Sequence, residues 1–396
     1  MKKTAQKKGN VHGPLALLGG LSAAQFLRRH WQKKPLLIRR AIADFVAPFS
    51  TREVLELSQR EDAESRLIAC LDKKWTLQDG PLTRRHFANV RNAKWTVLVQ
   101  DTQHFSAKAH ELLSQFKFIP LARIDDLMVS FAVKGAGVGP HVDSYDVFLL
   151  QGSGSRRWRI SSQQDLRLAK GAPLKVLANF KAEQEFVLEC GDMLYLPPGF
   201  AHDGIAEEDC LTWSIGFRAP SQQELSAALL DFLRDEISPR GLYCDPDLSP
   251  AMHPGEIDAT MRQRVRKMLV DIQLAARDPT NQLRCLGRYL TDPKPHVFFD
   301  APVPALGAGA FRRAAYRQGV LLDLKTRFLY AHGRFFMNGS EFLLEGVNAN
   351  LFRSLADNRN LPAEKIAAGD GKEFQNALYG VYADGFLHLA GSSPFA

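Results

Sequence analysis

The tripeptide His141-Val142-Asp143 and the distant His202 are the residues of this chain best suited to chemistry. Side chains two positions apart on a β-strand point to the same face, so His141 and Asp143 can act on one centre. Two imidazoles and one carboxylate are the ligand set of a non-haem Fe(II) site that leaves open positions for a cosubstrate and O2. The pattern therefore predicts oxygen chemistry at a metal held by His141, Asp143 and His202.

The segments around these residues have the composition of strands joined by turns. The Gly-rich run that ends at Pro140 leads into the first ligand, and residues 145–151 resemble a buried strand. Residues 156–160 begin a partner strand, and residues 189–202 contain a strand, a Pro-Pro-Gly corner and then His202. Short strands with turns at close intervals are typical of an antiparallel double-sheet barrel, which we expect to position the three ligands.

Several runs of this sequence resemble the JmjC-type ribosomal oxygenases, and in particular their bacterial branch. They are residues 139–148 (GPHVDSYDVF), 156–159 (RRWR), 191–199 (GDMLYLPPG) and 214–220 (SIGFRAP), with further likeness at 30–38 and 123–130. The resemblance is dense over about 25–220 and looser toward the C-terminus. It implies an α+β chain: a double-stranded β-helix (jelly-roll or cupin, JmjC-type) barrel, then a helical segment and a C-terminal winged-helix-like domain.

The same resemblance implies an Fe(II)- and 2-oxoglutarate-dependent protein hydroxylase that uses O2 and hydroxylates an arginine of a large-subunit ribosomal protein. Three alternatives stay open: a JmjC-type demethylase, a hydroxylase of another protein residue, and a non-catalytic cupin-like binding protein. The intact set of His141, Asp143 and His202 counts against the binding protein. The absence of a zinc-cluster spacing or a histone-reader signature in the sequence counts against the demethylase.

The distal carboxylate of 2-oxoglutarate requires a cationic anchor, and an arginine suits it because its planar fork can pair with a carboxylate through two bonds. Arg156, Arg157 and Arg159 are the candidates. Strand alternation puts Arg156 on one face and the other two on the opposite face, without saying which face is inward. The resemblance assigns the anchor to Arg156.

Further site residues are expected on neighbouring strands. Ser130 and Thr212 are predicted to line the pocket and to add hydrogen bonds to 2-oxoglutarate. Asp125 matches a family residue that contacts the substrate, where it would pair with a substrate guanidinium, and Ser144 is also assigned to substrate binding. The alternative for Asp125 is an aspartate at the strand edge that only solvates a turn.

Composition is that of an ordinary globular chain, with 396 residues, 45% hydrophobic and 24% charged. This length predicts two or three domains. A net charge of +8 either favours an RNA-rich partner or has no special meaning. Five cysteines without Cys-x-x-Cys spacing predict a reducing compartment, which we take as the cytoplasm. No apolar run reaches the length of a membrane span, so no membrane association is expected.

We expect four regions along the chain. They are a disordered basic tail (1–20), which superficially resembles a signal peptide, an oxygenase barrel (21–220), a helical dimerisation segment (221–295) and a winged-helix-like domain (296–396). Apolar residues at helical spacing follow residue 221: Leu225, Leu229, Phe232 and Leu233. This stripe either packs internally or forms a homodimer, and the resemblance favours the homodimer. Residues 300–396 contain no dense basic helix, so direct DNA binding is not expected.

Overall fold

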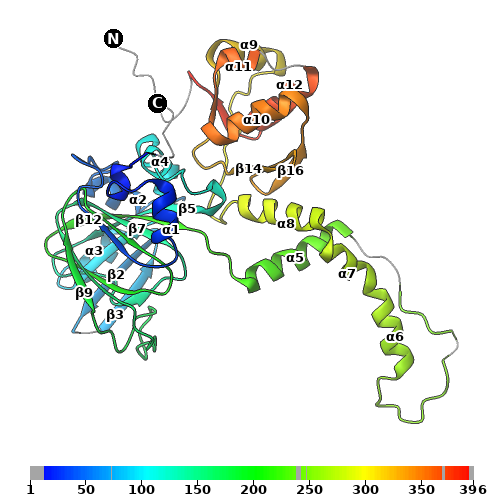
Figure 1. Cartoon of the computed structure of the whole chain (residues 1–396), viewed down its shortest axis with the longest axis horizontal. Helices are drawn as coiled ribbons and strands as arrows, with labels where there is room; N and C mark the ends of the chain where they lie inside the picture. The colour runs from blue at the N-terminus through cyan, green and yellow to red at the C-terminus, as the bar shows by residue number, and fades with distance from the viewer. Residues whose placement is uncertain (1–12, 73, 238–241, 247, 368–370, 392–396) are drawn as a thin grey trace.

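The computed structural model describes residues 13–72, 74–237, 242–246, 248–367 and 371–391. They form three parts in chain order: a β-barrel, an arm of helices, and a smaller C-terminal domain that lies beside the barrel (Figure 1). Among these residues, no helix is both long enough and apolar enough to cross a membrane.

Two antiparallel sheets form the barrel. The larger has the strand order β1-β10-β7-β12-β5-β4-β2-β3, and the smaller has the order β6-β11-β8-β9. Some neighbouring strands are distant in sequence, such as β5 and β12 or β7 and β12, whereas β2 with β3 and β8 with β9 are consecutive. The strands are β1 (Leu36–Ile38), β2 (Ser65–Leu71), β3 (Lys74–Asp79), β4 (Lys94–Val99), β5 (Ile124–Ala132), β6 (His141–Val142), β7 (Val147–Ser153), β8 (Arg156–Ser161), β9 (Gln184–Leu188), β10 (Met193–Leu196), β11 (Ala201–Ala206) and β12 (Cys210–Phe217).

Alternation along the strands separates two apolar layers. One face of β5 directs Leu127 and Val129 into a core between the larger sheet and the helices that cover it. The other face carries Met128 and Ser130, in register with residues of β12 and β7 that face the smaller sheet. A second apolar cluster fills the space between the two sheets, where Leu149 meets residues such as Trp158 and Ile160. Apolar side chains thus fill one part of the barrel interior, and polar side chains line the remaining part.

Helices cover the outer face of the larger sheet. They are α1 (Ala23–Arg29), α2 (Thr51–Leu57), α3 (Arg84–Val90) and α4 (Ala107–Ser114), with short 3-10 turns η1 (Ala16–Leu18), η2 (Thr102–His104) and η3 (Leu121–Arg123). A capping box between Ser22 and Gln25 starts α1. The prediction of a tail over 1–20 is wrong for residues 13–20, because Leu17 and Leu18 of η1 are buried in the barrel core. Residues 1–12 lie outside the described residues.

The arm consists of α5 (Gln222–Ile237), α6 (Ala259–Met268), α7 (Val270–Arg277) and α8 (Pro279–Thr291). It extends away from the barrel, with α6 at its far end (Figure 1). Phe232 and Leu233 are buried against Cys285 inside the arm, and Leu229 packs beside them. Most of the stripe predicted on α5 therefore holds the arm together, since Leu225 alone of its four residues is exposed.

The described residues of the C-terminal domain form four helices and two three-stranded sheets with orders β17-β13-β18 and β14-β15-β16. Asn338 and Gly339 both have positive φ at the β15–β16 turn, the conformation that the Asn-Gly pair predicts. Its aromatic core includes Phe335, Phe352 and Phe374. The elements are α9 (Ala308–Gln318), β13 (Val320–Leu322), β14 (Phe328–Ala331), β15 (Arg334–Met337), β16 (Ser340–Leu343), α10 (Gly346–Asn358), β17 (Asn360–Leu361), α11 (Ala363–Ala367), α12 (Gly371–Ala383) and β18 (Leu387–Leu389).

Candidate metal centre

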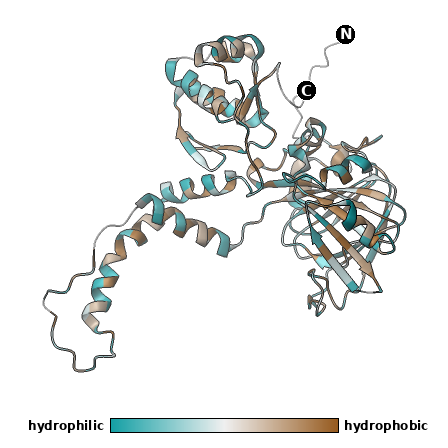
Figure 2. Ribbon diagram, turned by 180° about the vertical axis from the view of Figure 1, so that it is seen from behind, coloured by the Kyte–Doolittle hydropathy of each residue, from teal (hydrophilic) through white to brown (hydrophobic). Residues whose placement is uncertain are grey.

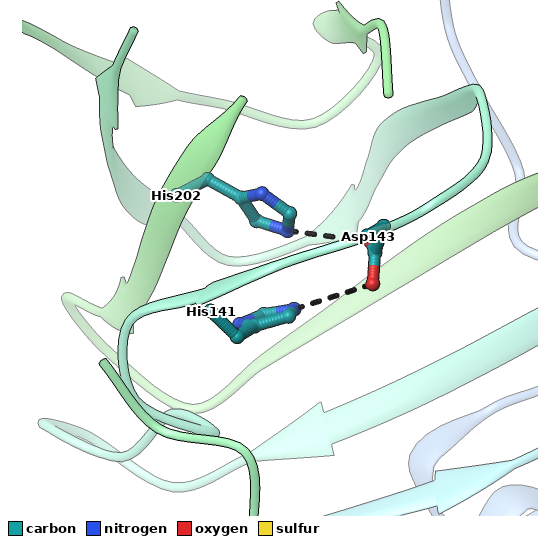
Figure 3. A group of neighbouring side chains, drawn as sticks. All are labelled: His141, Asp143 and His202. Carbon is teal, nitrogen blue, oxygen red and sulfur yellow. Dashed lines mark ion pairs between the residues drawn. The ribbon is translucent and has the colours of Figure 1, made fainter. Parts of the chain in front are cut away.

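The three predicted ligands meet at one end of the smaller sheet. His141 and His202 are directly opposite each other in the pairing of β6 with β11, and Asp143 follows β6. Nε2 of His141 lies 3.9 Å from Asp143 Oδ1, and Nε2 of His202 lies 3.5 Å from Asp143 Oδ2 (Figure 3). One potential ligand atom from each residue lies within 4.8 Å of the others. This spacing is suited to three ligands on one face of a metal ion.

Backbone carbonyls fix the orientation of both rings. Nδ1 of His141 lies 2.9 Å from the carbonyl oxygen of Gly139, and Nδ1 of His202 lies 3.0 Å from that of Phe200. A carbonyl can only accept, so each Nδ1 carries the proton and each Nε2 presents a lone pair toward Asp143. Burial, and then the neighbouring His141, lower the pKa of His202 to about 4. A neutral His202 is available as a ligand near neutral pH, and this donor set fits a divalent ion such as Fe(II).

The arginines of β8 divide between the two faces of the strand. Arg156, Trp158 and Ile160 are buried in the barrel. Arg157 instead pairs with Glu185 and Glu207 on the outer face, and Arg159 pairs with Asp203. The structure therefore settles the direction that alternation left open: the Arg156 face is inward.

Arg156 is a buried cation whose hydrogen-bond donors are only partly used. It is 5% exposed, and its Nη1 donates to Ser130 Oγ over 3.2 Å. Its Nε and Nη2 atoms are buried without a partner among the described residues. A buried charge left partly unpaired is costly, so a site of this kind is suited to a ligand carboxylate.

The distance between Arg156 and the metal ligands follows from the register of β8 with β11. His202 is opposite Ile160, and Ala206 is opposite Arg156, so Arg156 and His202 face the same interior four strand positions apart. At about 3.3 Å per residue, their backbone positions are roughly 13 Å apart. Such a separation, shortened by the length of the two side chains, is suited to a short dicarboxylate bound at both ends.

Ser130 and Thr212 lie at the Arg156 end of this space. They are paired residues of β5 and β12, and both are buried. Ser130 accepts the bond from Arg156, whereas the Thr212 hydroxyl donates to Gln151 Oε1 over 3.0 Å. Gln151 is fully buried and was not among the sequence predictions. Ser144, on the loop after Asp143, is exposed.

Asp125 points away from this interior. Its Oδ1 lies 3.5 Å from Arg218, 3.5 Å from Lys294 and 3.4 Å from Arg327, so it joins the barrel to the residues after the arm and to the C-terminal domain. The next residue, Asp126, shares the inward face of β5 with Met128 and Ser130. The same alternation could have identified it from the sequence.

Tyr145, which follows the ligand Asp143 by two positions, connects Asp126 to the metal ligands. A Cβ built on Gly216 would be 3.0 Å from Asp126 Oδ1 and 3.9 Å from the Tyr145 ring, so both side chains adjoin that glycine. Burial, followed by the charges of Asp143 and Asp126, raises the pKa of the Tyr145 hydroxyl. Burial also raises the pKa of Asp126 to about 7, with the carboxylate of Asp101 adding to the effect. A cation brought to Asp126 would thus favour the charged form of a carboxylate that is otherwise partly protonated near neutral pH.

Comparisons with known proteins agree with this geometry. A family model described as "JmjC domain" matches residues 111–225, and one described as "ROXA-like winged helix" matches residues 273–388. The Escherichia coli protein named "Ribosomal protein uL16 3-hydroxylase" is 32% identical over 355 residues, which is 89% of this chain and 93% of that protein. A "Probable ribosomal oxygenase" of Haemophilus influenzae is 40% identical over 229 residues, 57% of this chain and 54% of that protein.

Comparison with solved structures supports the same family. The crystal structure of Escherichia coli YcfD superposes with a TM-score of 0.80 at 31% identity, and covers 93% of this chain and 98% of that one. The structure of YcfD with cobalt and 2-oxoglutarate superposes with a TM-score of 0.77 at 32% identity and the same coverage. The predicted fold class is confirmed: a JmjC-type barrel followed by a winged-helix domain. This chain belongs to the JmjC-domain ribosomal oxygenases.

Proposed function

We propose that this chain is an Fe(II)- and 2-oxoglutarate-dependent dioxygenase that hydroxylates an arginine side chain of a large-subunit ribosomal protein. Likeness to the Escherichia coli uL16 3-hydroxylase over most of both chains supports the reaction and the class of substrate. The observation that supports 2-oxoglutarate as the cosubstrate is the buried Arg156. It has two nitrogens without a partner among the described residues, and it faces the same interior as His202.

Each site residue has a role in this reaction. His141, Asp143 and His202 would hold Fe(II), which, with 2-oxoglutarate and O2, supplies the oxidising power to hydroxylate an unactivated C–H bond while 2-oxoglutarate becomes succinate and CO2. Arg156, positioned by Ser130, would bind the distal carboxylate of 2-oxoglutarate. Thr212 and Gln151 would keep the neighbouring wall polar and fixed through their mutual hydrogen bond.

A substrate guanidinium requires a carboxylate at the opening of the barrel. We assign this role to Asp126, because it lies on the inward face of β5 and beside Tyr145. The prediction that Asp125 has this role is the less favoured one, since its carboxylate already lies near three cations. Ser144, exposed beside the ligand Asp143, is proposed to contact the substrate backbone at the rim.

The arm is proposed to form a homodimer interface, through residues other than those first expected. Apolar side chains remain exposed along the arm, including Leu230 at 64% and Leu274 at 60%. Hydrophobic residues alternate with hydrophilic ones along the ribbon of the arm (Figure 2). Helix α6 buries none of its residues within this chain, although it carries Met261, Val265 and Met268. An arm of this composition is suited to a second copy of the chain, because exposed apolar patches of this extent usually mark an interface.

Two further assignments concern location and nucleic acid. We propose that the enzyme acts in the cytoplasm, because its five free cysteines agree with a reducing compartment. We propose that the winged-helix domain does not bind DNA, since α10 carries Arg353 as its one basic residue and α9, its most basic helix, carries three arginines.

The direct test is metal-dependent turnover of 2-oxoglutarate. Purified protein with Fe(II), 2-oxoglutarate and air should release succinate, and His141→Ala or Asp143→Ala should abolish the release. Arg157→Ala is the matched control on the outer face of β8 and should keep wild-type turnover. Succinate release by the wild type that persists in a strong chelator would refute the proposal.

A further inference from the structure

Positive charge is concentrated at the start of this chain. Residues 1–43 contain ten Lys and Arg and no Asp or Glu, whereas the whole chain contains 51 basic and 43 acidic residues. Residues 44–396 therefore hold 41 basic against 43 acidic residues and are close to neutral. The net charge of +8, unremarkable when spread over the whole chain, comes entirely from this short segment.

Four of these cations belong to a described surface that we name the basic turn: Arg28, Arg29, Lys33 and Lys34. All four are exposed, and none forms an ion pair with another described residue. The Lys33 ammonium donates to the carbonyl oxygen of Arg28, which brings the two halves of the basic turn together. Some other exposed arginines of the barrel, such as Arg52 and Arg167, are instead paired with carboxylates.

The basic turn is attached to β10 and to the segment that follows the metal ligand Asp143. The Gln32 backbone N–H donates to Tyr195 Oη over 2.8 Å, and its side-chain amide donates to Asp146 Oδ2 over 3.0 Å. The Trp31 ring stacks on Tyr195 with 6.0 Å between centroids. Asp146 follows the metal-ligating Asp143 by three positions. The basic turn is thus anchored to the barrel at a residue three positions after the ligand Asp143.

A fixed group of unpaired cations without an apolar neighbour is suited to a phosphate backbone. A membrane surface would favour exposed apolar residues beside the cations, but Ala23 and Phe26 of α1 are buried and Trp31 packs against the barrel. We propose that the basic turn binds the phosphates of ribosomal RNA and docks the enzyme beside its protein substrate. This inference rests on the proposed function, because a ribosomal protein is the reason that RNA lies near the substrate.

The binding test uses the full-length protein and a short fluorescein-labelled RNA hairpin, followed by fluorescence anisotropy. Four phosphate contacts predict that the affinity falls roughly 50- to 150-fold between about 50 and 200 mM salt. The double variant R28E/R29E should bind at least about tenfold more weakly at low salt, with about half the salt dependence. The matched control is R84E/R85E, which reverses two exposed arginines of α3 and should bind like the wild type.

Equal loss of RNA affinity in R28E/R29E and R84E/R85E would overturn the proposal, because net charge and not the basic turn would then explain binding. Binding of the wild type to vesicles containing phosphatidylglycerol as tightly as to RNA, lost in R28E/R29E, would overturn it in favour of a membrane surface.

A turnover assay separates this inference from the proposed function. R28E/R29E should hydroxylate an isolated ribosomal-protein peptide like the wild type, and should act at least about tenfold more slowly on an RNA-containing ribosomal precursor at low salt. Equal activity on both substrates would overturn the inference alone. RNA binding that depends on Arg28 and Arg29 without any hydroxylation would leave the inference standing and remove the proposed reaction.

Discussion

The side chain of Arg156 gives the sharpest prediction about the cosubstrate. Arg156→Met keeps an unbranched side chain in the barrel and removes the guanidinium, including the 3.2 Å bond to Ser130 and the two nitrogens without a partner. A hydrogen bond to a charged group contributes about 1.5–3 kcal/mol, so the Kd for 2-oxoglutarate should rise roughly 10- to 150-fold. Iron binding should be unchanged, because Arg156 lies four strand positions from the pairing site of His202.

The same substitution has an expected effect on stability that distinguishes a binding residue from a structural one. Burying a cation without a counter-charge costs free energy, so the midpoint of thermal unfolding of the ligand-free protein should not fall in Arg156→Met. Calorimetric titration of 2-oxoglutarate into the Fe(II) protein without O2 measures the affinity, and Arg157→Met serves as the surface control. A weaker affinity in Arg157→Met with a normal one in Arg156→Met would refute the assignment of the inward face.

Three further predictions concern the substrate, the arm and pH. Asp126→Asn should raise the KM for an arginine peptide at least about tenfold while substrate-free 2-oxoglutarate turnover continues; an equal effect of Asp125→Asn alone would move the guanidinium site. Leu274→Glu should convert a dimer into a single chain by light scattering, and a wild-type mass of one chain would contradict the dimer. Burial lowers the pKa of His104 from 6.5 to about 4, so stability that is present above pH 6.5 should be lost as pH falls toward 4, by up to about 3 kcal/mol. His104→Gln should flatten that loss in urea unfolding, and an unchanged pH profile would show that other groups cause it.

The metal ligands could be predicted because their geometry depends on short-range rules. The spacing of His141 and Asp143 on a strand places them together in any register. Bringing His202 beside them requires a strand pairing that the sequence alone does not specify, and here the family resemblance supplied it. The inward direction of Arg156 is a similar case. Alternation left this direction open, although Trp158 and Ile160 share the face of Arg156, and their apolar side chains would have favoured it as the face that meets the core.

The two adjacent aspartates illustrate what the sequence-based assignment of the substrate-binding carboxylate missed. Asp125 and Asp126 have the same chemistry, and only strand alternation from Ser130 separates the one that faces the barrel interior from the one that joins the domains. The partners of Asp125 include Lys294 and Arg327, which come from much later in the chain, so no local pattern could have revealed them.

The apolar stripe on α5 was open to two interpretations for a related reason. Leu229, Phe232 and Leu233 have helical spacing whether they pack within one chain or between two copies, and the periodicity carries no information about the partner. The structure shows that Phe232 and Leu233 pack within the arm. Similarly, the Leu-rich run over 15–18 follows a basic stretch that favoured a tail, although its burial depends on the distant core residues that it contacts.

Mass spectrometry of a ribosomal-protein substrate tests the central claim most directly. The purified large-subunit protein equivalent to uL16 should be incubated with wild-type enzyme, Fe(II), 2-oxoglutarate and air, with His141→Ala as the matched inactive control. We predict a mass increase of one oxygen atom on a single arginine, with one succinate released per hydroxylation, and no change with the variant. An unmodified substrate in the presence of continuing, iron-dependent succinate release would contradict the account, because the site would then act on a different substrate.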